Sequence, residues 1–185
     1  EHQKLPLIPQ NISLIQRLLD DDPNPSIPGV SQNKLTCLNP MNNTIIISAH
    51  SPVELHVFDS QGRHVGPTTD GRIESNIPRS GYDVVAHNSF AYVPAGDTYR
   101  IELDATDAGS VDLHIEQYDG ENVADKITYL QVPLQSSSTQ VKVLFTDFDA
   151  PHELTIDADG NGVPESSTDP TAVLNGLTSA DALPP

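Results

Sequence analysis

The chain has 185 residues, of which 26 are acidic and 9 are basic, so its formal net charge is −17 at pH 7. A surface this acidic repels the phosphates of nucleic acids and of anionic lipids, which excludes both as expected partners and makes divalent cations the natural counter-ions. Apolar residues make up only 36% of the chain and 16 prolines are spread along it, which predicts short elements and many turns. No apolar stretch approaches the roughly 20 residues of a membrane-spanning helix, so no membrane insertion is expected.

Residues 1–34 differ from the rest of the chain because their prolines are too closely spaced for regular structure. Between these prolines, the stretch SLIQRLLDD (13–21) places apolar residues at helical spacing, which predicts one short amphipathic helix. About two helical turns are marginal in water alone, so the apolar stripe needs a partner surface. We interpret 1–34 as an N-terminal arm or linker. It begins at Glu1 and not at Met, as expected of a mature form whose leader has been removed.

From residue 35 the apolar residues alternate with polar ones, which is typical of strands with one buried face. Inward-facing side chains are expected at Val53, Leu55, Val57, Tyr99, Ile101, Leu103, Val111, Leu113 and Ile115. Further strands are expected within 43–50, 126–134, 139–148 and 152–157, with turns at 59–62 and 105–109. This pattern predicts an all-β fold, an antiparallel Ig-like or jelly-roll-like β-sandwich over 35–165, followed by a C-terminal tail over 166–185.

The stretch IDADGNGVPESSTD (156–169) is the best candidate for a binding site. Asp157, Asp159 and Asn161 occupy alternate positions, and Gly162 allows the sharp turn that lets their oxygens converge. Val163 follows with its backbone carbonyl as a further ligand. Hard cations such as Ca²⁺ prefer six to eight oxygen ligands, so this spacing predicts a Ca²⁺ loop. The alternative is a solvated Asp/Gly turn on an acidic surface.

The same residues resemble the D-x-D-G-[DN]-G loops of EF-hands, dockerins and thrombospondin type 3 repeats. That resemblance implies a bidentate Glu at the twelfth position, where this chain has Thr168, and Pro164 blocks the helix that usually follows. Glu165 or Asp169 is expected to complete the ligand shell instead. An ion here is expected to be structural, tying the last strand to the C-terminal tail.

Other candidate sites are weaker. None of the seven histidines has the spacing of a zinc motif, and His56 and His114 are predicted to be solvated on polar strand faces. No nucleophile motif is present, so no enzymatic activity is expected. Cys37 is interpreted as a small buried hydrophobe, with a reactive thiol as the alternative. The sequons at Asn11 and Asn42 would permit glycosylation of a secreted protein.

The stretches 50–66 and 91–117 are also similar to the Ig-like β-sandwich modules of secreted bacterial and archaeal proteins, hydrolases among them. The leading hypothesis is a non-catalytic, secreted or cell-surface structural subunit that assembles with copies of itself into a filament, tubule or surface layer through its arm. The alternative is an accessory module of a larger secreted hydrolase or adhesin. Carbohydrate binding lacks support because the chain has no Trp and only 5% aromatic residues.

Overall fold

The computed structural model describes residues 43–50, 52–119 and 122–176. Most of the features predicted before residue 43 lie outside these ranges, namely the N-terminal arm with its helix, Cys37 and both sequons. The end of the predicted tail, 177–185, lies outside them as well. The described residues form an all-β fold of two antiparallel sheets, which confirms the prediction of an all-β sandwich.

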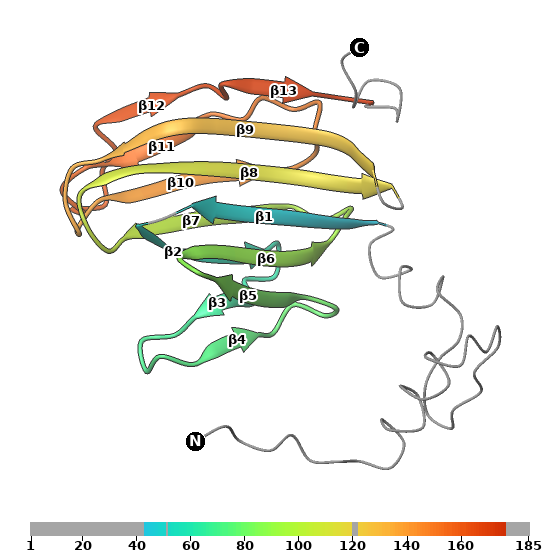
Figure 1. Cartoon of the computed structure of the whole chain (residues 1–185), viewed down its shortest axis with the longest axis horizontal. Helices are drawn as coiled ribbons and strands as arrows, with labels where there is room; N and C mark the ends of the chain where they lie inside the picture. The colour runs from blue at the N-terminus through green and yellow to red at the C-terminus, as the bar shows by residue number, and fades with distance from the viewer. Residues whose placement is uncertain (1–42, 51, 120–121, 177–185) are drawn as a thin grey trace, which may run out of the picture. The chain divides into compact units, whose positions relative to one another are not determined.

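Two antiparallel sheets make up this fold (Figure 1). The first sheet has the order β13 (Ala172–Leu174), β9 (Asn122–Leu134), β8 (Gly109–Asp119), β1 (Thr44–His50), β6 (Asn88–Pro94) and β5 (Gly81–Val85). The second has the order β12 (Ser166–Thr168), β11 (Leu154–Asp157), β10 (Gln140–Phe145), β7 (Tyr99–Ala105), β2 (Val53–Asp59), β3 (His64–Pro67) and β4 (Ile73–Ser75). Consecutive strands often belong to different sheets, so the chain repeatedly crosses between the two layers.

The two sheets bury one shared hydrophobic core, as a β-sandwich requires. The nine residues predicted from the alternating pattern are all buried, at alternate positions of β2, β7 and β8. Each fully buried Val, Leu or Ile stabilises the fold by roughly 1.5–3 kcal/mol. The predicted turn at 105–109 does not close a hairpin, because β7 and β8 lie in different sheets and the turn carries the chain across the core.

Two buried tyrosines place their polar tips on backbone carbonyls at the rim of the core. Tyr99 donates a hydrogen bond to the carbonyl of Pro94 at 2.5 Å, and Tyr129 donates one to the carbonyl of His152 at 2.7 Å. Burial, followed by the nearby negative charge of Asp97, raises the pKa of Tyr99 to about 12. Both hydroxyls are therefore neutral hydrogen-bond donors at physiological pH, and neither is left without a partner.

The segment after β11 adds one strand to each sheet. β12 pairs with β11 in the second sheet, and β13 then crosses to pair with β9 in the first. Between them Thr171 donates its backbone N–H to the carbonyl of Thr128 at 2.8 Å, and its hydroxyl oxygen accepts the N–H of Leu130 at 3.0 Å. The start of the predicted tail thus joins the two layers along one side of the sandwich (Figure 1).

Candidate metal centre

The acidic loop forms the connection of the β11–β12 hairpin. Ile156 of β11 pairs with Ser166 of β12, and the N–H of Glu165 donates to the carbonyl of Ile156 at 3.0 Å. The chain therefore leaves the sheet at Asp157 and returns to it at Glu165. Because β11 and β12 pair at the base of the loop, the side chains of the loop residues are held close to one another.

Asp157 is the anchor of this loop. Its side chain is buried, with 4% of the residue exposed. One carboxylate oxygen accepts the N–H groups of Gly160 at 2.8 Å and Asn161 at 3.1 Å, and the other accepts the N–H of Gly162 at 2.7 Å. These hydrogen bonds fix both carboxylate oxygens in orientation, which lowers the entropy cost of binding a ligand there.

Two further carboxylates converge on Asp157. One oxygen each of Asp157, Asp159 and Glu165 lies within 4.8 Å of the others. Asp159 is held by the N–H of Asn161 at 3.1 Å, and Glu165 accepts the N–H of Ala158 at 2.6 Å. Three negative charges at this separation repel one another, and a divalent cation among their oxygens would remove that repulsion.

Glycine and a buried threonine fit the loop onto the sandwich. Gly160 has φ +75°, and a Cβ atom there would lie 2.6 Å from the carbonyl oxygen of Ser138. Gly162 has φ +90° but faces open space. Thr139, which is fully buried, donates its hydroxyl to the carbonyl of Ala158 at 3.0 Å. The loop therefore rests directly on the β9–β10 turn, and glycine is the residue that this close approach requires.

The remaining predicted ligands are placed as follows. Asn161 turns its side-chain oxygen back to accept the N–H of Val163 at 2.8 Å, and Val163 itself is exposed. Thr168 pairs with Leu154 at the far end of the hairpin, and Asp169 follows it, so Asp169 is not one of the three converging carboxylates. Of the two residues predicted to complete the shell, Glu165 is the one that lies beside Asp157.

This donor set suits a hard cation. Carboxylates and an amide or backbone oxygen on a tight loop are the ligands that Ca²⁺ prefers, and its flexible coordination tolerates a shell completed by water. Asp157, Asp159 and Glu165 are the first, third and ninth residues of the loop. A strand stands on each side of this loop.

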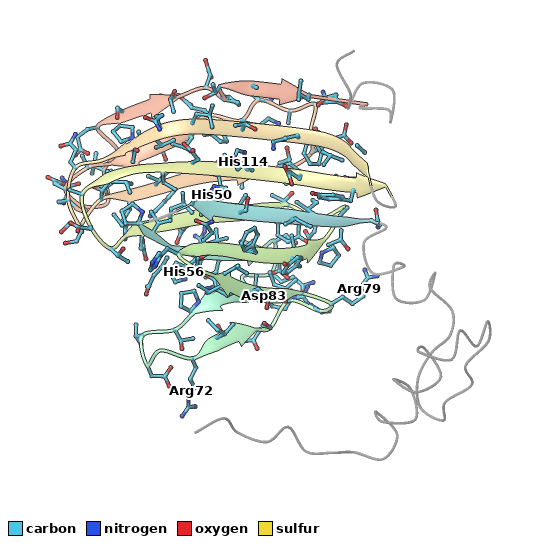
Figure 2. The ribbon with its side chains drawn as sticks, viewed as in Figure 1. His50, His56, Arg72, Arg79, Asp83 and His114 are labelled. Carbon is cyan, nitrogen blue, oxygen red and sulfur yellow. The ribbon has the colours of Figure 1, made fainter. Side chains whose placement is uncertain are left out.

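The histidines give a different result from the one predicted. The side chain of His56 is 15% exposed and that of His64 12%, so both are half-buried, and their stacked rings have centroids 5.3 Å apart. His114 stands against His50 on the first sheet, with ring centroids 5.1 Å apart (Figure 2). Burial is the main cause that lowers the pKa of both His56 and His114. The turn at 59–62 is the sequence feature that could have indicated this pair. It joins β2 to β3, which makes His56 and His64 diagonal neighbours on one face of the sheet.

Within the described ranges no helix is long and apolar enough to cross a membrane. Comparisons of the chain with protein-family models, with curated proteins and with solved structures found no match.

Proposed function

We propose that this chain is a non-catalytic, extracellular β-sandwich module in which Ca²⁺ binds the 157–165 loop and stabilises the C-terminal strand pair. The convergence of Asp157, Asp159 and Glu165 at the closed end of the β11–β12 hairpin is the observation that carries the proposal. Extracellular modules bind Ca²⁺ with dissociation constants of about 10⁻⁴–10⁻³ M, and the concentration of Ca²⁺ outside cells reaches this range. A free-standing role and a role within a larger secreted protein are both compatible with such a module.

The position of the loop gives the ion a mechanical effect on both sheets. The loop leads directly into β12 and then β13, which are three residues each and exposed along their whole length. Strands this short contribute little burial of their own, so their pairing depends on what fixes their ends. A cation that holds Asp157 to Glu165 fixes the entry to β12, and through it the strand that crosses to the first sheet.

Hydrogen exchange with and without Ca²⁺ tests this role. The N–H of Gly162 donates to Asp157, and the N–H of Thr171 donates to Thr128 in the bridge to β13. Both amides are expected to exchange at least tenfold more slowly in saturating Ca²⁺ than in chelator, while core amides of β7 are unchanged. Asp157→Asn should abolish the difference, whereas Asp107→Asn, in the exposed turn after β7, should retain it. Equal exchange with and without Ca²⁺ in the wild type would refute the proposal.

Self-assembly is the second candidate, and one feature favours it. Val84 and Val85 of β5 are 59% and 61% exposed, and β5 is the edge strand of the first sheet as far as the chain is described. Ile73, on the edge strand β4 of the second sheet, is 49% exposed. An apolar sheet edge is a template on which a neighbouring copy of the chain can add a strand.

Light scattering coupled to size exclusion tests assembly of the full chain in Ca²⁺. Growth of the molar mass with concentration is expected, and Val84→Lys should return the chain to a monomer because a charge at the edge opposes strand addition. Leu144→Lys is the matched control, since Leu144 is 58% exposed but lies on β10 inside the second sheet. A monomer at every concentration would remove this candidate and leave the isolated module.

A further inference from the structure

The outer face of the second sheet carries a pair of histidines whose ring nitrogens face each other. His56 stands on β2 and His64 on the neighbouring strand β3. His56 Nδ1 lies 3.1 Å from His64 Nε2, and the two rings are nearly parallel at an interplanar angle of 21°. Phe58 also stacks on the His64 ring, with 4.7 Å between the ring centroids.

Gly66 provides the space for this pair. It lies two residues after His64 on β3 and has φ +147°. A Cβ atom at this position would lie 2.9 Å from His64 Nε2 and 2.7 Å from the carbonyl oxygen of Leu55. Any side chain larger than hydrogen would therefore clash with the His64 ring and with the backbone of β2, so glycine leaves the room that the pair needs.

Carboxylates lie behind both rings. His64 Nδ1 is 2.8 Å from Glu74 Oε2, and the other oxygen of Glu74 accepts a hydrogen bond from Asn76 at 2.6 Å. On the far side, His56 Nε2 lies 3.6 Å from Asp104 Oδ2. His56 Nε2 is buried and has no hydrogen-bond partner within the described part of the chain. The four side chains thus form a row, Glu74, His64, His56 and Asp104.

The three contacts along this row need three N–H protons, but two neutral imidazoles supply only two. Each neutral imidazole carries a single N–H, and ionised carboxylates only accept. If both N–H groups point to the carboxylates, then His56 Nδ1 and His64 Nε2 face each other with lone pairs. If His56 donates to His64 instead, its Nε2 faces Asp104 with no proton between them. Either arrangement leaves a position that a positive charge would fill.

We propose that His56 Nδ1 and His64 Nε2 together bind one divalent transition-metal ion of the Zn²⁺ class. Two nitrogen ligands of tetrahedral Zn²⁺, at about 2.0–2.1 Å from the metal, stand about 3.4 Å apart, and the observed separation of 3.1 Å is close to this distance. The N–H groups of His64 Nδ1 and His56 Nε2 then point to the carboxylates of Glu74 and Asp104. This is the usual arrangement around metal-bound histidine, where it fixes the tautomer and raises the basicity of the ligand.

The surroundings provide negative charge and space for a metal ion. Glu54, Glu102 and Asp104 contribute negative charge on the same face, and a hollow of about 370 Å³ opens beside the rings, lined by Glu54, Thr68 and Asp104 among others. This hollow leaves room for water or a carboxylate to complete the coordination sphere.

Isothermal titration of Zn²⁺ into the full chain, in excess Ca²⁺ so that the acidic loop is occupied, tests the proposal. One site is expected. His64→Ala should abolish it, and Glu74→Gln should weaken it by about 10- to 100-fold, because the carboxylate only orients its ligand. One control should bind as the wild type does. His114→Ala alters the other histidine pair, in which His114 hydrogen-bonds to Thr128 instead of a carboxylate.

Circular dichroism checks that each variant is folded, and ring NMR signals of the wild type provide a measurement that needs no variant. Zn²⁺ should shift the signals of His56 and His64 and leave those of His50 and His114 in place. The proposal is overturned if the wild type binds no Zn²⁺, if folded His64→Ala retains the affinity, or if the NMR shifts fall on other histidines.

Discussion

Glu165 Oε2 accepts the backbone N–H of Ala158 at 2.6 Å, so the last residue of the acidic loop is tied to its second. The same carboxylate lies within 4.8 Å of the oxygens of Asp157 and Asp159. One side chain therefore closes the loop and also belongs to the candidate cation site. Because β12 and β13 follow directly, the site is coupled to the strands that join the two sheets.

Glu165 separates these two roles by substitution. Glu165→Gln keeps an oxygen that can accept the Ala158 N–H and removes the charge. In chelator its free energy of unfolding should therefore lie within about 0.5 kcal/mol of that of the wild type. Glu165→Ala removes the acceptor as well and should cost about 1–3 kcal/mol in chelator, since the N–H loses a charged partner. Urea denaturation measures both. If the two variants are equally unstable without Ca²⁺, the hydrogen bond does not hold the loop.

The two glycines of the loop are predicted to differ. Gly160→Ala meets the Ser138 carbonyl oxygen at 2.6 Å in addition to its unfavourable φ of +75°, and it should destabilise by about 2–3 kcal/mol. Gly162→Ala faces open space at φ +90° and should cost about 1 kcal/mol from backbone strain alone. Thermal unfolding of the two variants in chelator compares them directly. A larger loss for Gly162→Ala would contradict the packing of the loop on the β9–β10 turn.

Asp59 is predicted to be the main electrostatic determinant of the β2–β3 hairpin. Its carboxylate accepts the N–H groups of Gln61 and Arg63, both at 2.9 Å, and the Arg63 guanidinium at 2.6 Å. Burial alone would raise the pKa of Asp59, but these hydrogen bonds outweigh it and hold the pKa below its ordinary value. Asp59→Ala should cost about 2 kcal/mol in urea denaturation, whereas Asp70→Ala, at an exposed ion pair with Arg72, should change stability by less than about 1 kcal/mol.

Stability should fall as the pH is lowered through the histidine range. Burial depresses the pKa of His56 and of His114 in the folded chain. The unfolded chain therefore binds protons first, and the stability that is fully present above the ordinary pKa of 6.5 is lost as the pH falls toward the folded values. Urea denaturation in chelator between about pH 7.5 and about pH 5.5 should show this slope. The double variant His56→Gln, His114→Gln should be flatter, and an unchanged slope would refute the assignment.

The alternating apolar pattern predicted the central strands because a half-buried strand imposes a period of two on its sequence. Val53, Leu55 and Val57 are buried for this reason, with Leu55 and Val57 fully so. The prediction missed β4 (Ile73–Ser75) and β5 (Gly81–Val85), which are edge strands with mostly exposed side chains, and it also missed β6 (Asn88–Pro94), although buried and half-buried residues alternate along that strand. Where no face is buried, the sequence carries no periodic signal, and only pairing with a neighbouring strand defines the element.

The candidate site was predictable to the extent that its ligands are local. Asp157 and Asp159 lie on one tight turn, so spacing alone brings them together. The choice of Glu165 over Asp169 depends on the β11–β12 hairpin, in which Glu165 returns beside the first loop residue. The histidine pair depends on a turn, a glycine and two carboxylates on other strands. The spacing of residues along the sequence does not predict such groupings, because their members are far apart in the chain.

Differential scanning calorimetry of the wild type and Asp159→Asn, each with Ca²⁺ and with chelator, tests the central claim most directly. At Ca²⁺ of about 100 times the dissociation constant, binding to the folded state adds about 2.7 kcal/mol, which corresponds to a rise in Tm of about 5–11 °C for a domain of this size. Asp159→Asn removes one of the three converging charges, so it should lose most of this rise while matching the wild type in chelator. A wild-type Tm that is the same with Ca²⁺ and with chelator, or an equal rise in the variant, would contradict the account.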